Sequence, residues 1–151
     1  RRFNAIAKPY YDAVFQKIEN MKADGKTPIL VSVHTMTDQL SGGAFRDEAF
    51  AVLSDPVDPI SRRFLSALRK ATQLKVGDNV PYALETGIDF TVPECTNVTG
   101  IPAIMLELRQ DLTFDPDTMA KHANEIAEAL KDCLDGVAGP KSADTVSRAP
   151  V

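Results

Sequence analysis

Two charged residues, Glu107 and Arg109, stand in the largely apolar segment of residues 100–112. If this segment is a strand, its side chains alternate between two faces, so Glu107 and Arg109 share one face. Burying charged groups costs free energy unless they are paired or used. Two interpretations are open: a structural Glu–Arg ion pair on a half-exposed strand, or a ligand site at the carboxyl end of a strand.

A histidine follows a second strand-like segment. Residues 29–33 are almost continuously apolar and rich in β-branched side chains, which is typical of a central strand covered on both faces, and His34 comes next. An imidazole at the carboxyl end of a strand can be a metal ligand, a general base or an ordinary hydrogen-bonded side chain. His34 alone cannot form a zinc site, which usually needs three protein ligands. The residues by themselves leave catalysis and binding undecided.

The other residues of reactive type indicate no second site. His122 lies in a helical pattern, where we expect it on the helix surface. Cys95 and Cys133 form no CxxC pair, and Cys133 fits a packed helix position. The sequence contains neither a phosphate-binding loop nor a nucleophile elbow.

Alternating helical and strand-like segments must position these residues. Helix starts are indicated where proline opens a helical pattern, at Pro9, Pro59 and Pro116. Residues 50–53 are a weaker strand candidate, residues 93–99 a short helix, and residues 73–92 are rich in turn residues and predicted to be irregular. This order predicts an α/β fold, a mostly parallel or mixed sheet sandwiched between helices.

Composition narrows the class of protein. The 151 residues, 44% hydrophobic and 25% charged, suffice for one α/β domain, which we place at residues 1–135, with a flexible tail at 136–151. A net charge of −4 provides no basic surface for nucleic acid. No apolar run approaches the ~20 residues that cross a bilayer. With no signal peptide and only two cysteines, we expect a cytoplasmic protein.

Four segments in register, spread over roughly residues 8–134, resemble the N-formylglutamate amidohydrolase family. They are Lys8-Pro-Tyr-Tyr-Asp-Ala13, the strand ending in His34-Thr-Met-Thr37, the turn Val76-Gly-Asp-Asn-Val-Pro-Tyr82, and Phe90-Thr-Val-Pro leading through Gly100-Ile-Pro102 to Glu107-Leu-Arg-Gln-Asp-Leu112. The family is described as zinc-dependent hydrolases with a fold akin to the zinc carboxypeptidases. The resemblance therefore implies a phosphorylase/hydrolase-like α/β fold and a small-molecule N-acyl amino acid as substrate.

The resemblance also implies roles for individual residues. His34 would match a histidine ligand of zinc, and Glu107 the carboxylate that activates water. The implied substrate-binding residues are Arg109, which would hold a carboxylate by a two-pronged contact, Asn79 and Tyr82, which would line the pocket, and Thr37, which would shape the turn after His34. The expected reaction hydrolyses the N-formyl, or another N-acyl, amide of an acidic amino acid to formate and glutamate, a step of amino-acid degradation.

The chain departs from the family pattern at several positions. The family's first metal-ligand motif lies upstream of the segment that resembles residues 8–13, and this chain contains nothing of it. Asp38 replaces a proline, Cys95 replaces a histidine, and residues 43–48 replace a Trp-His stretch. Cys95 is either a soft metal ligand or a small buried residue. We therefore expect the C-terminal part of a longer catalytic domain. The alternative is a catalytically impaired relative that binds a small carboxylate ligand.

Overall fold

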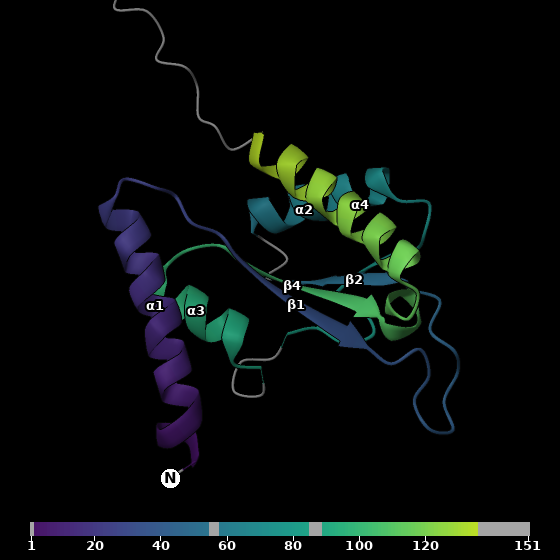
Figure 1. Ribbon diagram of the computed structural model, residues 1–151, viewed down its shortest axis with the longest axis horizontal. Coiled ribbons are helices and arrows are strands. Elements are labelled where there is room, and N and C mark those ends of the chain that lie inside the picture. The colour runs from purple at the N-terminus through teal and green to yellow at the C-terminus, as the bar shows by residue number, and fades with distance from the viewer. Residues whose placement is uncertain (1, 55–57, 85–88, 136–151) are drawn as a thin grey trace, which may run out of the picture.

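A computed structural model of the chain describes residues 2–54, 58–84 and 89–135. It has a sheet between two groups of helices (Figure 1). The elements, in chain order, are the π-helical turn η1 (Phe3–Ala7), α1 (Lys8–Ala23), β1 (Leu30–Met36), β2 (Phe50–Leu53), α2 (Pro59–Ala71), β3 (Val76–Asp78), α3 (Thr91–Thr99), β4 (Ala103–Arg109), the 3₁₀ turn η2 (Gln110–Thr113) and α4 (Pro116–Asp135). The predicted tail, residues 136–151, lies outside the described residues.

The four described strands form a mixed sheet in the order β1-β4-β2-β3. β1 runs parallel to β4, while β2 runs antiparallel to β4 and parallel to β3. This arrangement confirms the predicted α/β class. β3 lies within residues 73–92, so the prediction that this region is irregular is wrong there. A three-residue strand that includes Gly77 and Asp78 carries too little β-propensity to stand out in the sequence.

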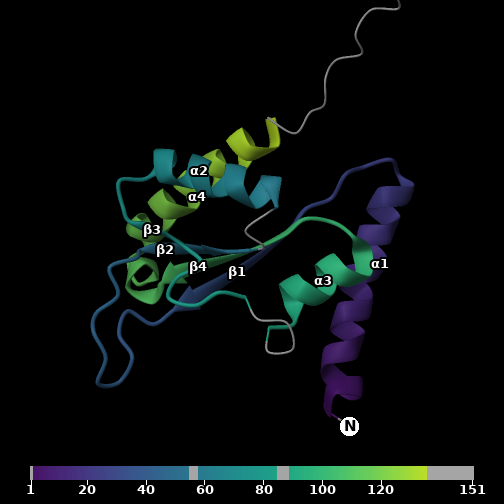
Figure 2. The same ribbon diagram turned by 180° about the vertical axis from the view of Figure 1, so that it is seen from behind.

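Helices cover both faces of the sheet (Figure 2). α2 and α4 cover one face, where the largest hydrophobic cluster includes Phe50, Phe64, Leu68, Ile104 and Leu106. α3 covers the other face through Val92, which packs with Met105 and Leu53, and α1 packs behind α3 through Ile18 and Cys95. None of the described helices combines the length and apolar character needed to cross a membrane.

The start of α2 and the end of α3 lie where the sequence predicts them, and each has a capping residue. The Asp58 carboxylate accepts hydrogen bonds from the backbone N–H groups of Ile60 and Ser61, and Pro59 opens α2. Gly100 ends α3 in the left-handed conformation, with φ of 69°. Capping side chains and glycine act on their own backbone neighbours, which is why the sequence alone located these ends.

The structure corrects two other expectations. β1 is not a central strand: within the described residues it lies at one edge of the sheet, and Val33 is 62% exposed. β1 also extends to Met36, so His34 lies inside the strand. His122 is not on the helix surface: it is 3% exposed, its ring meets that of Phe50 edge to face, and its Nδ1 lies 2.8 Å from Oε2 of Glu125. The packing of α4 onto the sheet determines which helix face is buried.

Candidate functional site

His34 and Glu107 are neighbours across two parallel strands. The β1–β4 register pairs them directly, and two residues further along it pairs Met36 with Arg109. Side chains alternate along each strand, so Glu107 lies on the same face as Met105, which is the face that α3 covers. Glu107 is therefore an interior position of the sheet face rather than a residue at its rim.

Glu107 has two carboxylate oxygens in different surroundings. The residue is 5% exposed, and the hydroxyl of Tyr82 donates a hydrogen bond of 2.5 Å to Oε1. Oε2 is buried and has no hydrogen-bond partner among the described residues. An unpaired buried carboxylate oxygen costs free energy unless a ligand, an ion or a water molecule bonds to it. Oε2 is thus the oxygen left for a ligand or a water molecule.

The His34 side chain is exposed at the open edge of the sheet. Its Nε2 lies 2.9 Å from Oγ of Ser32, two residues earlier on the same face of the strand. Ser32 was missed as a site residue, although the period of two would have placed it beside His34. The imidazole next to Glu107 can bind an incoming group.

The turn after β3 carries Tyr82 to Glu107. A Cβ atom on Gly77 would lie 2.5 Å from Cγ2 of Val80, so only glycine allows the chain to fold back this closely. Asn79 adopts a positive φ of 51°, its N–H donates to the Val52 carbonyl, and its Oδ1 accepts a hydrogen bond from the Ser54 N–H. The Val80–Pro81 peptide bond is cis. The Gly-Asp-Asn-x-Pro-Tyr pattern therefore has a local structural cause.

The surroundings of Tyr82 keep its hydroxyl protonated. Burial, the hydrogen bond to Glu107 and the negative charges of Glu107 and Asp89 together raise the pKa of Tyr82 to about 12, while the positive charge of Arg46 acts in the opposite direction. At neutral pH the phenol is a hydrogen-bond donor and not a base. It orients the carboxylate of Glu107.

Arg109 does not pair with Glu107, so the structural Glu–Arg ion pair is ruled out. Its Nε and Nη2 donate to the two carboxylate oxygens of Asp111 at 2.7 and 3.1 Å, because the 3₁₀ turn after β4 brings Asp111 beside the guanidinium. Its Nη1 donates to the backbone carbonyl of Arg46 at 2.8 Å, and the ring of Phe45 stacks 4.7 Å from the guanidinium carbon. The predicted contact of Arg109 with a substrate carboxylate stays a prediction.

Thr37 contacts the turn that follows β1. Its hydroxyl donates to the Gln39 carbonyl at 2.9 Å and lies 3.5 Å from the donating Nε2 of Gln110. The Thr37 carbonyl accepts a hydrogen bond of 3.1 Å from Nη1 of Arg46. These contacts are those of a residue that shapes the turn, and its contact with substrate stays a prediction.

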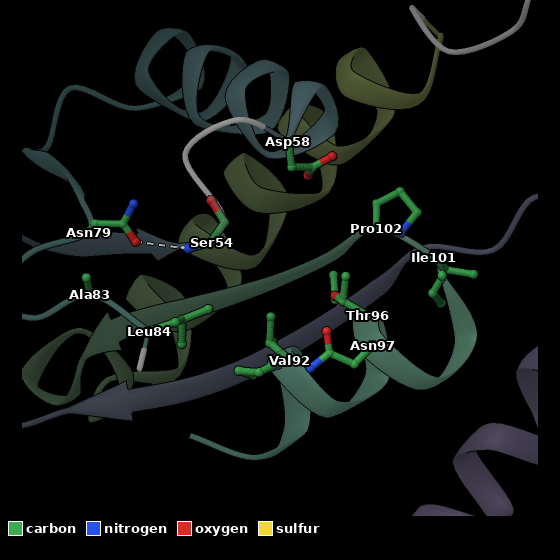
Figure 3. Close-up of a pocket in the computed structure, with 13 residues that line it drawn as sticks. Ser54, Asp58, Asn79, Ala83, Leu84, Val92, Thr96, Asn97, Ile101 and Pro102 are labelled. Atoms are coloured by element: carbon green, nitrogen blue, oxygen red, sulfur yellow. Dashed lines mark hydrogen bonds between the residues drawn. The ribbon is translucent and has the colours of Figure 1, made fainter. Parts of the chain in front are cut away.

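Asn79 faces a different space from Tyr82. It lines a cavity of about 580 Å³ between the ends of β2 and β3 and helix α3. Figure 3 shows Asn79 and Ser54 on one side of this cavity and Val92 and Thr96 of α3 on another. Glu107 and His34 are not among its lining residues. Asn79 thus lines this cavity, whereas Tyr82 contacts Glu107.

The residues present do not form a complete metal site. Among those that the structure describes, no three His, Cys, Asp or Glu side chains are grouped to hold one ion. Cys95 is buried between α3 and α1, as expected of a small packed residue, and burial raises the pKa of its thiol. His34 is an accessible imidazole beside a carboxylate, so it fits the part of one ligand and no more.

Comparisons with known proteins agree with this description. The sequence profile of the N-formylglutamate amidohydrolase family matches residues 1–114. A search of curated proteins finds no significant match. The solved structure of gene product Atu2144 from Agrobacterium tumefaciens is similar with a TM-score of 0.80 and 26% identity, covering 90% of this chain and 53% of that one. The chain spans about half the length of the solved structures it matches.

A second solved structure is an N-formylglutamate amidohydrolase from Ralstonia eutropha JMP134. Its TM-score is 0.60 at 16% identity, and the match covers 89% of this chain and 54% of that one. At this identity the likeness shows the fold alone. The family assignment therefore depends on the sequence profile, which covers most of the chain.

Proposed function

Because this chain belongs to the N-formylglutamate amidohydrolase family, we propose that it takes part in hydrolysing the N-formyl amide of an acidic amino acid, with formate and glutamate as products. One observation carries the proposal. Glu107 is buried beside His34, with one carboxylate oxygen held by Tyr82 and the other without a partner among the described residues. Such a carboxylate suits proton transfer to and from a bound water.

In the proposed reaction, Oε2 of Glu107 takes a proton from the water molecule that attacks the formyl carbon. The C–N bond then breaks, and Glu107 passes the proton to the leaving nitrogen, so that the carboxylate is regenerated. Tyr82 stays a neutral donor throughout, since its pKa is raised to about 12. Its hydrogen bond keeps Oε1 occupied and directs Oε2 at the water.

We also propose that His34 is one ligand of a zinc ion, which would polarise the formyl carbonyl. The described residues supply this imidazole but no complete set of metal ligands, so the proton transfers are assigned to Glu107 alone. Titration calorimetry with zinc on the wild-type chain and on His34→Ala tests the ligand directly. Loss of a measurable zinc heat in His34→Ala supports it, and unchanged binding rejects it.

Formate release from N-formyl-L-glutamate, with zinc supplied, tests the function. Glu107→Gln keeps the shape of the side chain and removes the base, so we expect the rate to fall about 10²–10⁴-fold. Glu128→Gln, the same change at an exposed position of α4, is the control and leaves the rate unchanged. A wild-type chain without formate release, or a Glu107→Gln variant with full activity, contradicts the proposal.

The departures from the family pattern at Asp38, Cys95 and residues 43–48 favour a second candidate function, that of a binding protein for a small carboxylate ligand. Thermal unfolding with glutamate or N-formylglutamate, with and without zinc, separates the two. Stabilisation that needs no zinc, together with no formate release, supports the binding protein. Stabilisation that requires zinc, together with turnover, supports the hydrolase.

A further inference from the structure

Arg109 holds the loop that precedes β2. Two of its nitrogens contact the Asp111 carboxylate, and a third donates to the backbone carbonyls of Arg46 and Asp47 at 2.8 and 3.4 Å. Phe45 stacks on the same guanidinium. A charged side chain that bonds to two successive carbonyls and one aromatic ring fixes the path of that loop. In the structure the partners of the Arg109 guanidinium are groups of the protein itself.

Arg46, on this loop, carries a second guanidinium, which contacts the end of the segment that bears His34. Its Nη1 donates to the carbonyl of Thr37, three residues after His34 along the chain, which corresponds to roughly 10 Å at the rise of a strand. Arg46 also lines a cavity of about 350 Å³ together with Phe45 and Pro81, the neighbour of Tyr82.

Arg46 differs from Lys75, the other cation that lines this cavity, in its ion pairs. Lys75 pairs with Glu48 at 2.9 Å and with Asp47 at 3.5 Å. None of the ion pairs between described residues includes Arg46. Its positive charge acts on two neighbours, Glu48 and Tyr82, and it acts to lower the pKa of each.

We propose that Arg46 binds a carboxylate of the acyl amino acid, and that Arg109 is a positioning residue that holds the Arg46 loop in place. A guanidinium anchored by one hydrogen bond to a backbone carbonyl keeps further N–H groups for a two-pronged contact with a carboxylate. This inference rests on the proposed function for the identity of the substrate. It adds the residue that selects an acidic side chain over a neutral one.

The test compares N-formyl-L-glutamate with N-formyl-L-glutamine, whose side-chain amide has the same shape without the charge. Arg46→Gln is expected to raise KM for the acid about 10- to 100-fold, the loss for removing a charge-assisted contact, with little change in kcat. The ratio of kcat/KM for N-formyl-L-glutamate to kcat/KM for N-formyl-L-glutamine falls toward one. Arg46→Lys restores part of it. Arg2→Gln, the same charge change at an exposed site, is the control and leaves both substrates unaffected.

A double variant separates the two arginines. If Arg109 acts only through Arg46, Arg109→Lys weakens acid binding in the wild-type background but adds nothing to Arg46→Gln. If the fold losses in acid binding of the two single variants multiply in the double variant, Arg109 contacts the substrate itself. That result overturns its positioning role. Circular dichroism of each variant confirms folding, and Arg46→Lys carries the test if Arg46→Gln does not fold.

A binding measurement keeps this inference distinct from the proposed function. Titration calorimetry of Glu107→Gln with N-formylglutamate reports binding without turnover. Binding that disappears in the Glu107→Gln/Arg46→Gln variant supports the anchor even if the wild-type chain releases no formate. Binding of equal strength with and without Arg46, or no binding by Glu107→Gln and by the wild-type chain alike, overturns it.

Discussion

The hydroxyl of Tyr82 donates to Oε1 of Glu107 over 2.5 Å and thereby makes the two oxygens of one carboxylate unequal. Oε1 is occupied, whereas Oε2 is buried without a partner among the described residues. The turn after β3, where Gly77 allows the chain to fold back closely, places Tyr82 beside Glu107. The parallel register of β1 and β4 places His34 there. A buried carboxylate, the phenol that bonds to it and an imidazole thus come from three separate parts of the chain.

Replacing Tyr82 with phenylalanine removes the hydroxyl and keeps the ring. Glu107 then loses a hydrogen bond to its charged form, a contact worth about 1.5–3 kcal/mol, so we expect kcat for formate release to fall about 10- to 100-fold. Stopped or continuous formate assays on Tyr82→Phe measure this. Tyr10→Phe, on an exposed part of α1, is the matched control. An unchanged kcat would show that the phenol does not orient the base.

The raised pKa of Tyr82 predicts how stability depends on pH in alkali. The folded state favours the protonated phenol, so its contribution is complete below the ordinary pKa near 10 and is lost as the pH rises toward about 12. Because Tyr82 is 42% exposed, solvent screening keeps this contribution small. Urea unfolding between pH 9 and 12 is expected to show a decline that is shallower in Tyr82→Phe. Parallel curves of unfolding free energy against pH for the wild type and Tyr82→Phe would contradict the raised pKa of Tyr82.

Gly77 has no room for a side chain. In Gly77→Ala the new Cβ would meet Val80 at 2.5 Å and Cγ of Glu48 at 3.0 Å, so we expect a loss of about 1–3 kcal/mol in the free energy of unfolding. Gly43→Ala is a suitable control, since the nearest atom there is the Leu40 carbonyl oxygen at 3.4 Å. Denaturant melts compare the two. Equal stability of both variants would mean that the turn adjusts without cost.

Asp78 and Arg62 join β3 to α2 through a two-pronged ion pair, with oxygen–nitrogen distances of 2.7 and 2.9 Å. The hydrogen bond to Arg62 lowers the pKa of Asp78, so the stabilisation is present above the ordinary pKa near 3.8 and disappears as the pH falls through the lower, folded value. Asp78→Asn should therefore destabilise the protein at pH 7 and reduce its sensitivity to acid. Asp12→Asn, in an exposed pair on α1, should change neither.

His122 is predicted to contribute to stability through its buried position. His122→Ala removes its contacts with Phe50 and with Glu125, and we expect the free energy of unfolding to fall by about 1–3 kcal/mol. Lys121→Ala, the exposed neighbour on α4, should stay within about 0.5 kcal/mol of the wild type. Thermal and urea unfolding of both variants would decide. Equal effects of the two substitutions would contradict the buried position.

Local chemistry in the sequence determined the α/β class, the cap of α2 at Asp58 and the end of α3 at Gly100. It also placed Glu107 and Arg109 on one face of a strand, because alternation follows from the backbone alone. Capping, proline and glycine preferences and the period of two need no distant contact, so they can be read without a structure.

The tertiary structure decided which groups meet. It placed β1 at the edge of the described sheet and buried His122. It also showed that Arg109 forms an ion pair with Asp111 and that the charge of Arg46 acts on Tyr82. The position of β1, the burial of His122 and the approach of Arg46 depend on strand register or on packing between residues far apart in the chain, whereas the Arg109–Asp111 contact depends on the 3₁₀ turn directly after β4. The sequence left a Glu107–Arg109 ion pair open, and only the fold separated the two into a carboxylate bonded to Tyr82 and a guanidinium that supports the loop before β2.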